Sequence, residues 1–549
     1  MSKQSFARGA VILAGASIIS RLLGAWYVVA LPRIIREEGM GLLQMVRPFY
    51  NLVVILSAAG LPVALSKLTA EQFAIGNTRG AVQIFKLTLA LLLVSGAVFA
   101  GILGAGSRWL VENILRDPLA YPALLALVPS VFFLGAASAF RGFFQGMQHV
   151  MPTAVSQVIE QVCRVGAMLA LAAVLTPQGV QFGAAGASFG STIGAAAGLT
   201  VMAAYYTRWR KNKVLLPGKA PAGQASFAVG VIGRLLSMSL PIVMGSILWP
   251  VMQMIDTSLV PVRMQAAGYS QDAVREALGH LGMALSLVHF PNVITQALSV
   301  TLVPAIAEAS ALNSYRRIQR RANDALRIAV IFGLPASTGL LILAEKAAFL
   351  MFGYAKAGEP LRILALGTLP IGLFQVCSGI LQGLGLVSIP VRNLAIGAIV
   401  KLAVNYWLTA LPGVGIRGAA WGTVFGFGTA SLLNLAAVCR RVRMQPDWQE
   451  ILLKPGLACL IMALGVVVAY DGFYRLLISM ARGSGWVWAR THSEALANGL
   501  AAVGTACAGT GIYGLGLLGT GGLYRRDIEM IPKIGRKLSR WFSSYGWLK

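Results

Sequence analysis

Long apolar stretches alternate with short charged segments along the whole chain. Each stretch has about 20 residues, the length of a helix that crosses the hydrocarbon core of a bilayer. Cutting the sequence at charges and at Pro/Gly pairs predicts about fourteen spans of this kind. The predicted spans are 10–31, 43–66, 82–105, 120–144, 152–175, 183–207, 233–257, 278–305, 325–345, 361–384, 390–411, 417–438, 453–472 and 496–519. The pattern therefore predicts an all-α, polytopic membrane protein.

Composition agrees with a membrane protein. Hydrophobic residues make up 57% of the 549 residues and charged residues only 12%, whereas a soluble domain carries roughly 25% charged residues. Lys and Arg outnumber Asp and Glu by 46 to 19, which gives a formal net charge of +27. The basic residues lie in short segments between apolar runs, as in 208–211 and 440–441. Such segments are typical of loops that face anionic lipid, so we expect no nucleic-acid partner.

The distribution of charge predicts the topology. With the N-terminus inside, most Lys and Arg fall in cytoplasmic segments. The outer segments are nearly neutral, because Arg36 lies beside Glu37 and Arg116 beside Asp117. An even number of spans then places both termini in the cytoplasm. The first apolar stretch is longer than the core of a signal peptide, so we expect it to be an uncleaved span.

Three motifs recur in the same order, which predicts an internal duplication. The pairs are 142–146 with 379–383, 183–185 with 418–420, and 61–64 with 303–306. Two lobes of about six spans each would then share one orientation and enclose a substrate path. The predicted parts are an N-lobe 1–210, a cytoplasmic linker 211–232, a C-lobe 233–445, two added helices 446–524, and a basic amphipathic tail 525–549.

A few charges fall inside predicted spans, where they are costly and usually face a wet cavity or a partner. Arg21 is near the centre of the first span, although an arginine bonded to carbonyls at a kink is the alternative. Arg47 lies about one turn into the second span, from which it can also snorkel to the interface. Glu160 and Arg164 are four residues apart and can neutralise each other. The repeat pairs Arg164 with Lys401, so both lobes carry a cation at similar depth.

These cations favour an anionic ligand. Guanidinium and ammonium groups suit phosphate oxygens, so we expect a pyrophosphate-bearing lipid at Arg21, Arg47, Arg164 and Lys401. The supporting polar residues are Glu160, Gln44 and Gln157. Asp256 is a candidate for a coupling ion, Na⁺ or H⁺, or lies at the outer interface beside Arg263.

Other kinds of chemistry lack support in the sequence. The five cysteines are dispersed and form no metal-binding spacing. Nucleophile–base, Walker and dinucleotide motifs are absent in a believable context. We therefore expect no metal, no cofactor and no enzymatic activity.

Four segments carry a family resemblance, namely 20–24 (SRLLG), 41–48 (GLLQMVRP), 141–146 (RGFFQG) and 156–164 (SQVIEQVCR). Together they resemble the stage V sporulation protein B family, a polysaccharide-transporter branch of the multidrug/oligosaccharidyl-lipid/polysaccharide exporter superfamily. The resemblance implies two six-helix lobes in a V with two added helices. It further implies alternating-access flipping of undecaprenyl-pyrophosphate-linked saccharides in the bacterial plasma membrane.

The match to the lipid II flippases of this superfamily is partial. Arg21 and Arg47 lie where those relatives keep basic residues, whereas Tyr27 and Ser286 replace two of their arginines. A cavity built this way is less cationic than theirs, and Arg164 and Lys401 would compensate.

Taken together, we expect a flippase for a peptidoglycan precursor such as lipid II or a related spore-cortex intermediate. Its expected partners are the lipid-linked saccharide, membrane lipids and cell-wall synthesis enzymes. Two rivals remain open. A cation-coupled multidrug exporter of the same fold would need carboxylates within the membrane, and a non-transporting scaffold for envelope synthesis would tolerate neutral substitution of Arg21.

Overall fold

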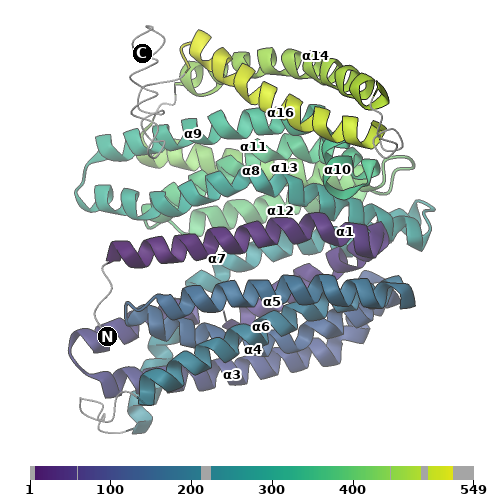
Figure 1. Ribbon diagram of the computed structural model, residues 1–549. Coiled ribbons are helices and arrows are strands. Elements are labelled where there is room, and N and C mark those ends of the chain that lie inside the picture. The colour runs from purple at the N-terminus through teal and green to yellow at the C-terminus, as the bar shows by residue number, and fades with distance from the viewer. Residues whose placement is uncertain (1–5, 59, 212–223, 445–446, 484–492, 523–549) are drawn as a thin grey trace. The chain divides into compact units, whose positions relative to one another are not determined.

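The computed structural model describes residues 6–58, 60–211, 224–444, 447–483 and 493–522 (Figure 1). Every regular element in these ranges is a helix, which confirms the all-α prediction. The elements are α1 (Phe6–Ala58), α2 (Leu61–Ala74), α3 (Thr78–Trp109), η1 (Leu110–Leu115), η2 (Pro118–Ala120), α4 (Tyr121–Gly146), α5 (Met151–Leu175), η3 (Thr176–Gln178), α6 (Val180–Lys211), α7 (Gln224–Ala266), α8 (Gln271–Ala311), α9 (Tyr315–Ile342), α10 (Ala344–Phe352), η4 (Ala355–Ala357), α11 (Gly358–Gly383), α12 (Ser388–Leu408), α13 (Ile416–Val442), η5 (Gln449–Leu453), α14 (Lys454–Gly483) and α16 (Ser493–Gly519). The predicted tail and most of the predicted linker lie outside the described residues.

Twelve helical stretches in the described part are long and apolar enough to cross a membrane. One of them, Gly15–Ala74, has 60 residues, enough for two crossings at about 20 residues each. The 21-residue α12 is outside this set, and it carries the buried Lys401, Asn393 and Asn405. Counting the second crossing and α12 gives the predicted number of about fourteen.

The predicted C-terminal end of the second span, residue 66, is wrong, because the helix ends at Ala58. Helix α1 is interrupted by a kink at Arg36, where φ is 61°, and its second half ends at Ala58. Gly60 then adopts a φ of 83°, a conformation that favours glycine. A Cβ at this position would lie 2.7 Å from Cα of Ser239 on α7. Pro62 follows in the first turn of α2, so a new helix begins there.

Helix packing divides the chain into a first unit, Met1–Gly279, and a second unit, His280–Lys549. In the first unit α4 packs against α3 and α6, and α5 packs against α6 and α1; α3 to α6 run side by side in Figure 1. Its core contains an aromatic cluster in which the ring of Phe85 lies 4.8 Å from the rings of Phe143 and Tyr206. Most of α7 falls in the predicted C-lobe, yet α7 packs against α1 and α2 of the predicted N-lobe. The predicted lobe boundaries therefore stay a prediction.

In the second unit α11 packs against both α9 and α13. The core of this layer includes Leu326, Cys377 and Val438. The two helices α14 and α16 pack on each other, and α14 also packs on α9. The hydroxyl of Tyr513 donates to the carbonyl of Ile331, at 3.0 Å, and ties α16 to α9. These are the two added helices that the sequence predicts after the repeat.

Element ends recur at an interval of 237 residues. Helix α4 spans Tyr121–Gly146 and α11 spans Gly358–Gly383, an identical length at that interval. The starts of α3 and α9, at Thr78 and Tyr315, are separated by the same interval, as are the starts of α5 and α12. This spacing supports the predicted duplication.

Close helix contacts repeat in the same register. A Cβ on Gly142 would lie 2.6 Å from the carbonyl of Pro62, and one on Gly379 would lie 2.7 Å from the carbonyl of Ser299. Pro62 and Ser299 are also 237 residues apart. The packing thus pairs Pro62 with Ser299, whereas the short sequence motif paired it with Pro304. A five-residue shift of this kind arises because Pro, Ala and Leu are common enough in apolar helices to match out of register.

Candidate functional site

Helix α5 carries a nearly buried carboxylate held by two arginines. One oxygen of Glu160 accepts from Arg141 of α4, and the other accepts from Arg164, one turn further along α5. The same Arg141 donates to the hydroxyl of Ser156 at 3.0 Å, and Ser156 donates to the carbonyl of Gly198 at 3.2 Å. The exposed fractions of the side chains are 9% for Glu160, 17% for Arg141 and 26% for Arg164. The cluster therefore carries one net positive charge.

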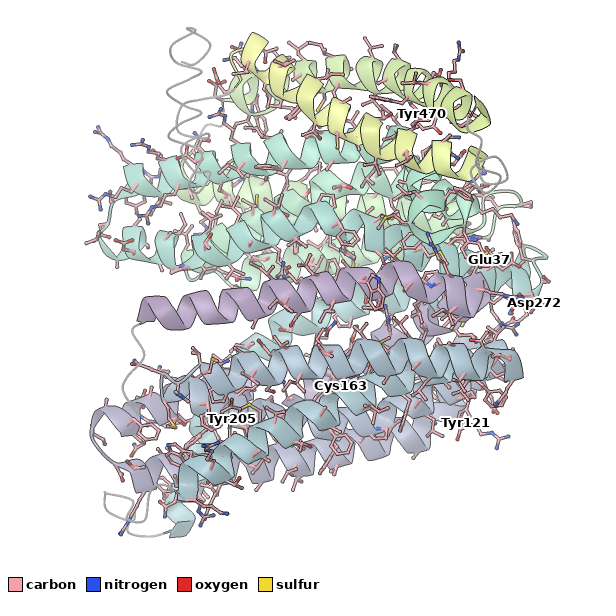
Figure 2. All side chains as sticks on the ribbon, in the orientation of Figure 1. Glu37, Tyr121, Cys163, Tyr205, Asp272 and Tyr470 are labelled. Atoms are coloured by element: carbon pink, nitrogen blue, oxygen red, sulfur yellow. The ribbon has the colours of Figure 1, made fainter. Side chains whose placement is uncertain are left out.

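The cluster lies deep in the predicted membrane. Glu160 is nine residues after Met151, the start of α5, which corresponds to about 14 Å along the helix axis. Half the thickness of the hydrocarbon core is about 15 Å. Figure 2 labels Cys163, the neighbour of Arg164, near the middle of α5. Charges at this depth need partners, and the ion pairs of Glu160 provide them.

Glycines on α6 fix the backbone behind the cluster. A Cβ on Gly194 would lie 2.6 Å from Cβ of Arg164 and 2.8 Å from the carbonyl oxygen of Glu160. A Cβ on Gly198 would lie 3.0 Å from the carboxylate of Glu160. Only small residues allow two helices to approach this closely. The spacing of these glycines thus determines where the carboxylate of Glu160 lies.

Helix α1 adds further cations to the first unit. Arg47 donates to the hydroxyl of Tyr27 at 3.2 Å, and its guanidinium carbon lies 6.0 Å from the centre of the ring. This contact joins the two halves of α1 across the kink. Gly24 packs next to Gln161 of α5, whose side chain accepts from Arg164 at 3.4 Å. Arg21, one turn before Gly24, is exposed.

The remaining predicted residues lie elsewhere or lack a defined role. Gln44 and Gln157 are half-buried. Asp256 is only 1% exposed, and both alternatives for it, a coupling-ion site or a position beside Arg263 at the outer interface, stay predictions. Lys401 is 2% exposed and belongs to the second unit. The structure thus brings Glu160 and Arg164 together with Arg141, and it places Lys401 in a separate unit.

The second unit has different side chains at the corresponding positions. The interval of 237 residues pairs Arg141 with Ser378, and it pairs Arg164 with Lys401. In this unit the side-chain amide of Asn393 donates to Asn434 at 2.8 Å, and the amide of Asn434 donates to Ser378 at 3.1 Å. The two units therefore carry different chemistry on matching helices.

Arg141 was not singled out from the sequence as a candidate site residue. A usable signal was nevertheless present. Helices α4 and α5 form a tight hairpin around 147–150, so residues equally distant from the turn lie opposite each other. Arg141 and Ser156 are at such distances, and Glu160 is one turn beyond.

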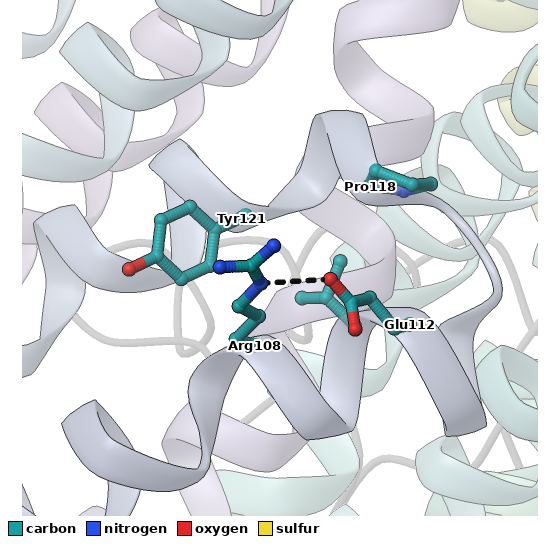
Figure 3. Close-up of a pocket in the computed structure, with 5 residues that line it drawn as sticks. Arg108, Glu112, Pro118 and Tyr121 are labelled. Atoms are coloured by element: carbon teal, nitrogen blue, oxygen red, sulfur yellow. Dashed lines mark hydrogen bonds and ion pairs between the residues drawn. The ribbon is translucent and has the colours of Figure 1, made fainter.

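A cavity of about 240 Å³ lies at another place in the first unit, where α3, η1 and α4 meet (Figure 3). Its lining includes Tyr121, Pro118 and the ion pair between Arg108 and Glu112, at 2.9 Å. Both charged side chains are exposed, at 79% and 49%, so this pair is an ordinary surface pair. Within the described ranges no group of three or more His, Cys, Asp or Glu residues could hold a metal ion.

Comparison with known proteins identifies the family. A family model described as polysaccharide biosynthesis protein matches residues 6–310, more than half of the chain. The chain belongs to this family. A model of the MatE family also matches residues 241–407. The family lies in the polysaccharide-transporter branch of the exporter superfamily, as the motifs predicted, and its members are transporters rather than enzymes.

Two proteins of Bacillus subtilis (strain 168) illustrate the relationship. Stage V sporulation protein B is 31% identical over 80% of this chain and 85% of its own length. Lipid II flippase MurJ is 27% identical over 78% of this chain and 81% of its own length.

Solved structures confirm the fold. An inward-facing MATE family multidrug resistance transporter has a TM-score of 0.63 at 14% identity, covering 77% of this chain and 94% of that one. Lipid II flippase MurJ in an inward closed conformation has a TM-score of 0.58 at 15% identity, covering 92% of this chain and all of that one. The chain is therefore a multi-pass membrane protein with the transporter fold of this superfamily.

Proposed function

We propose that this protein is a flippase that moves an undecaprenyl-pyrophosphate-linked saccharide from the inner to the outer leaflet by alternating access. The observation that carries this proposal is the set of cations in the first unit. Arg21 and Arg47 of α1 belong to the same unit as Arg141 and Arg164, which share the carboxylate of Glu160. Guanidinium groups bind phosphate oxygens through two parallel hydrogen bonds, so this surface suits a pyrophosphate head.

The relatives support the same substrate class. One is named a lipid II flippase, and another is named a sporulation protein. We therefore propose lipid II, or a related peptidoglycan precursor of the spore cortex, as the substrate. The prenyl chain would stay in lipid while the head passes the cations of the first unit.

Orientation and energetics follow from the distribution of charge. We propose that both termini are cytoplasmic, because the basic segments lie on that side of the predicted spans. An inside-negative potential then drives an anionic head outward by about 2.3 kcal/mol per charge for each 100 mV. Asp256, buried on α7, is the proposed position for a coupling ion.

A cation-coupled drug exporter is the second candidate, since a MatE model and MATE structures match. Such a transporter needs a carboxylate that is available inside the membrane. Both oxygens of Glu160 are bonded to arginines, so such an exporter would have to use Asp256 instead, and the two arginines at Glu160 favour the anionic substrate.

The decisive experiment is a flipping assay with the purified full-length protein in proteoliposomes. Fluorescent lipid II and other undecaprenyl-pyrophosphate sugars are the substrates, and a fluorescent phosphatidylcholine is the control lipid. We expect lipid II to cross faster than in empty vesicles, with Arg21→Gln and Arg47→Gln each slowing the transfer roughly tenfold or more. Arg108→Gln, which alters an exposed pair, is the matched control and should retain full activity. Lipid II transfer equal to that in empty vesicles would refute the proposal and favour a scaffold, whereas unchanged transfer by both variants would show that Arg21 and Arg47 do not bind the substrate.

A further inference from the structure

The two arginines that hold Glu160 are not equivalent. Arg141 has two partners, Glu160 and Ser156, and Ser156 is itself bonded to the backbone of α6. Arg164 has Glu160 and only a long contact of 3.4 Å with Gln161. Its side chain is also the more exposed of the two, at 26% against 17%. Arg164 is therefore the arginine that can leave.

Glu160 itself cannot follow a departing arginine. A methyl group at Gly198 would already lie 3.0 Å from its carboxylate oxygen, so α6 closes the space behind it. If Arg164 leaves, Glu160 keeps the ion pair with Arg141. A buried carboxylate that loses its only counter-ion is strongly destabilised, and the second arginine avoids this cost.

Arg164 also has an unused donor. Within the residues that the structure describes, its Nε is buried and makes no hydrogen bond. A phosphate oxygen can accept from Nε and a terminal nitrogen of one guanidinium at the same time. Rotation of Arg164 away from Glu160 would expose this edge to an anion.

We propose that Arg164 exchanges between Glu160 and the pyrophosphate of the substrate, so that Glu160 acts as a built-in competitor. This inference rests on the proposed function and deepens it. Competition weakens binding of the pyrophosphate and allows its release after translocation, because a transport site must bind firmly enough to load and weakly enough to unload. Glu160 is thus a positioning residue that acts through Arg164.

The test measures binding of inorganic pyrophosphate to the full-length protein in nanodiscs by calorimetric titration. Glu160→Gln removes the competitor, and we expect the dissociation constant to fall roughly tenfold, the size of one charge-assisted hydrogen bond. The double variant Glu160→Gln with Arg141→Met keeps the net charge of the cluster at its original value, and we expect the same tightening. Arg164→Gln should weaken binding, while Glu112→Gln, which breaks an exposed i,i+4 pair, should change nothing.

A second readout comes from lipid II transfer in proteoliposomes. Both Glu160 variants should lower KM and also lower kcat, because release becomes slower; a purely structural defect would lower kcat without tightening binding. Tightening in the single variant but not in the double variant would show an effect of net charge and overturn the exchange. Unchanged pyrophosphate affinity in both variants would also overturn it. If lipid II still crosses the membrane in either case, the proposed function stands without the exchange.

Discussion

A second buried ion pair offers a quantitative test of the fold. Asp117, at the start of η2, has a side chain that is 0% exposed, and Arg275 of α8 binds it from a position 158 residues away. Nη2 of Arg275 lies 3.2 Å from Oδ1 of Asp117, and Nε contacts the other oxygen. The same carboxylate accepts from the backbone nitrogen of Leu119 at 3.1 Å. Arg275 is 12% exposed and has one further partner, the exposed Asp272.

Two substitutions at Asp117 distinguish the energy of the ion pair from that of the helix cap, the hydrogen bond from the backbone nitrogen of Leu119. Asp117→Asn keeps an oxygen for the backbone nitrogen but leaves the arginine without its buried counter-charge, which costs about 3 to 5 kcal/mol. Asp117→Ala should cost about 1 kcal/mol more, because the cap is also lost. Asp272→Asn is the matched control, since it removes the exposed partner of the same arginine, and a pair of that kind is worth about 0 to 1 kcal/mol.

The assay is a double-variant cycle on unfolding by SDS titration in mixed micelles. Asp117→Asn combined with Arg275→Met removes both charges, so most of the lost stability should return. The expected coupling energy between the two positions is about 2 kcal/mol or more. If the double variant is as unstable as the sum of the single variants, these side chains do not act as a pair and the reasoning from burial is wrong.

Three further outcomes follow from single contacts. Tyr27→Phe keeps the ring but removes the hydrogen bond to Arg47, so KM for lipid II should rise roughly fivefold, and an unchanged KM would show that Arg47 needs no positioning. Gly190→Ala would place a Cβ 2.5 Å from a backbone nitrogen of α5, so the free energy of unfolding should fall by about 1 to 3 kcal/mol. Gly166→Ala is the control: its Cβ would meet nothing within 4 Å, and the same SDS titration should show unchanged stability. Burial holds the pKa of His149, in the loop between α4 and α5, below its ordinary value of 6.5. Its neutral form therefore contributes stability that is complete above pH 6.5 and is lost as the pH falls through the lower folded-state pKa, so thermal scans should show a smaller loss on acidification in His149→Gln than in the wild type.

Local charge pairs could be predicted from the sequence, and distant ones could not. The sequence places Arg108 one helical turn before Glu112, and the structure confirms that they pair. The ion pair between Asp117 and Arg275 could not be predicted in this way, because the two residues lie on different helices. A periodicity of 3.6 residues identifies partners within one helix. Partners on helices far apart in the chain can be identified only once the packing of those helices is known.

The same limit applies to the candidate site. Long apolar stretches were enough to predict most spans, because a chain that crosses a membrane must form its backbone hydrogen bonds within a helix. The pair formed by Glu160 and Arg164 was visible at helical spacing. Arg141 was not, since its role depends on the α4–α5 hairpin. The role of Tyr27 as a partner of Arg47 depends on the kink in α1.

The repeat in the sequence predicted the arrangement of helices better than it predicted the functional side chains, and the duplication explains why. Backbone contacts through Gly142 and Gly379 recur at the same interval, because any larger side chain there would push two helices apart in both units. Side chains that face inward between those contacts have no such constraint. Glu160 corresponds to Gly397, so the second unit lost, or never gained, the carboxylate that occupies Arg164 in the first. One helix framework can therefore carry an ion-paired arginine in the first unit and a buried lysine in the second.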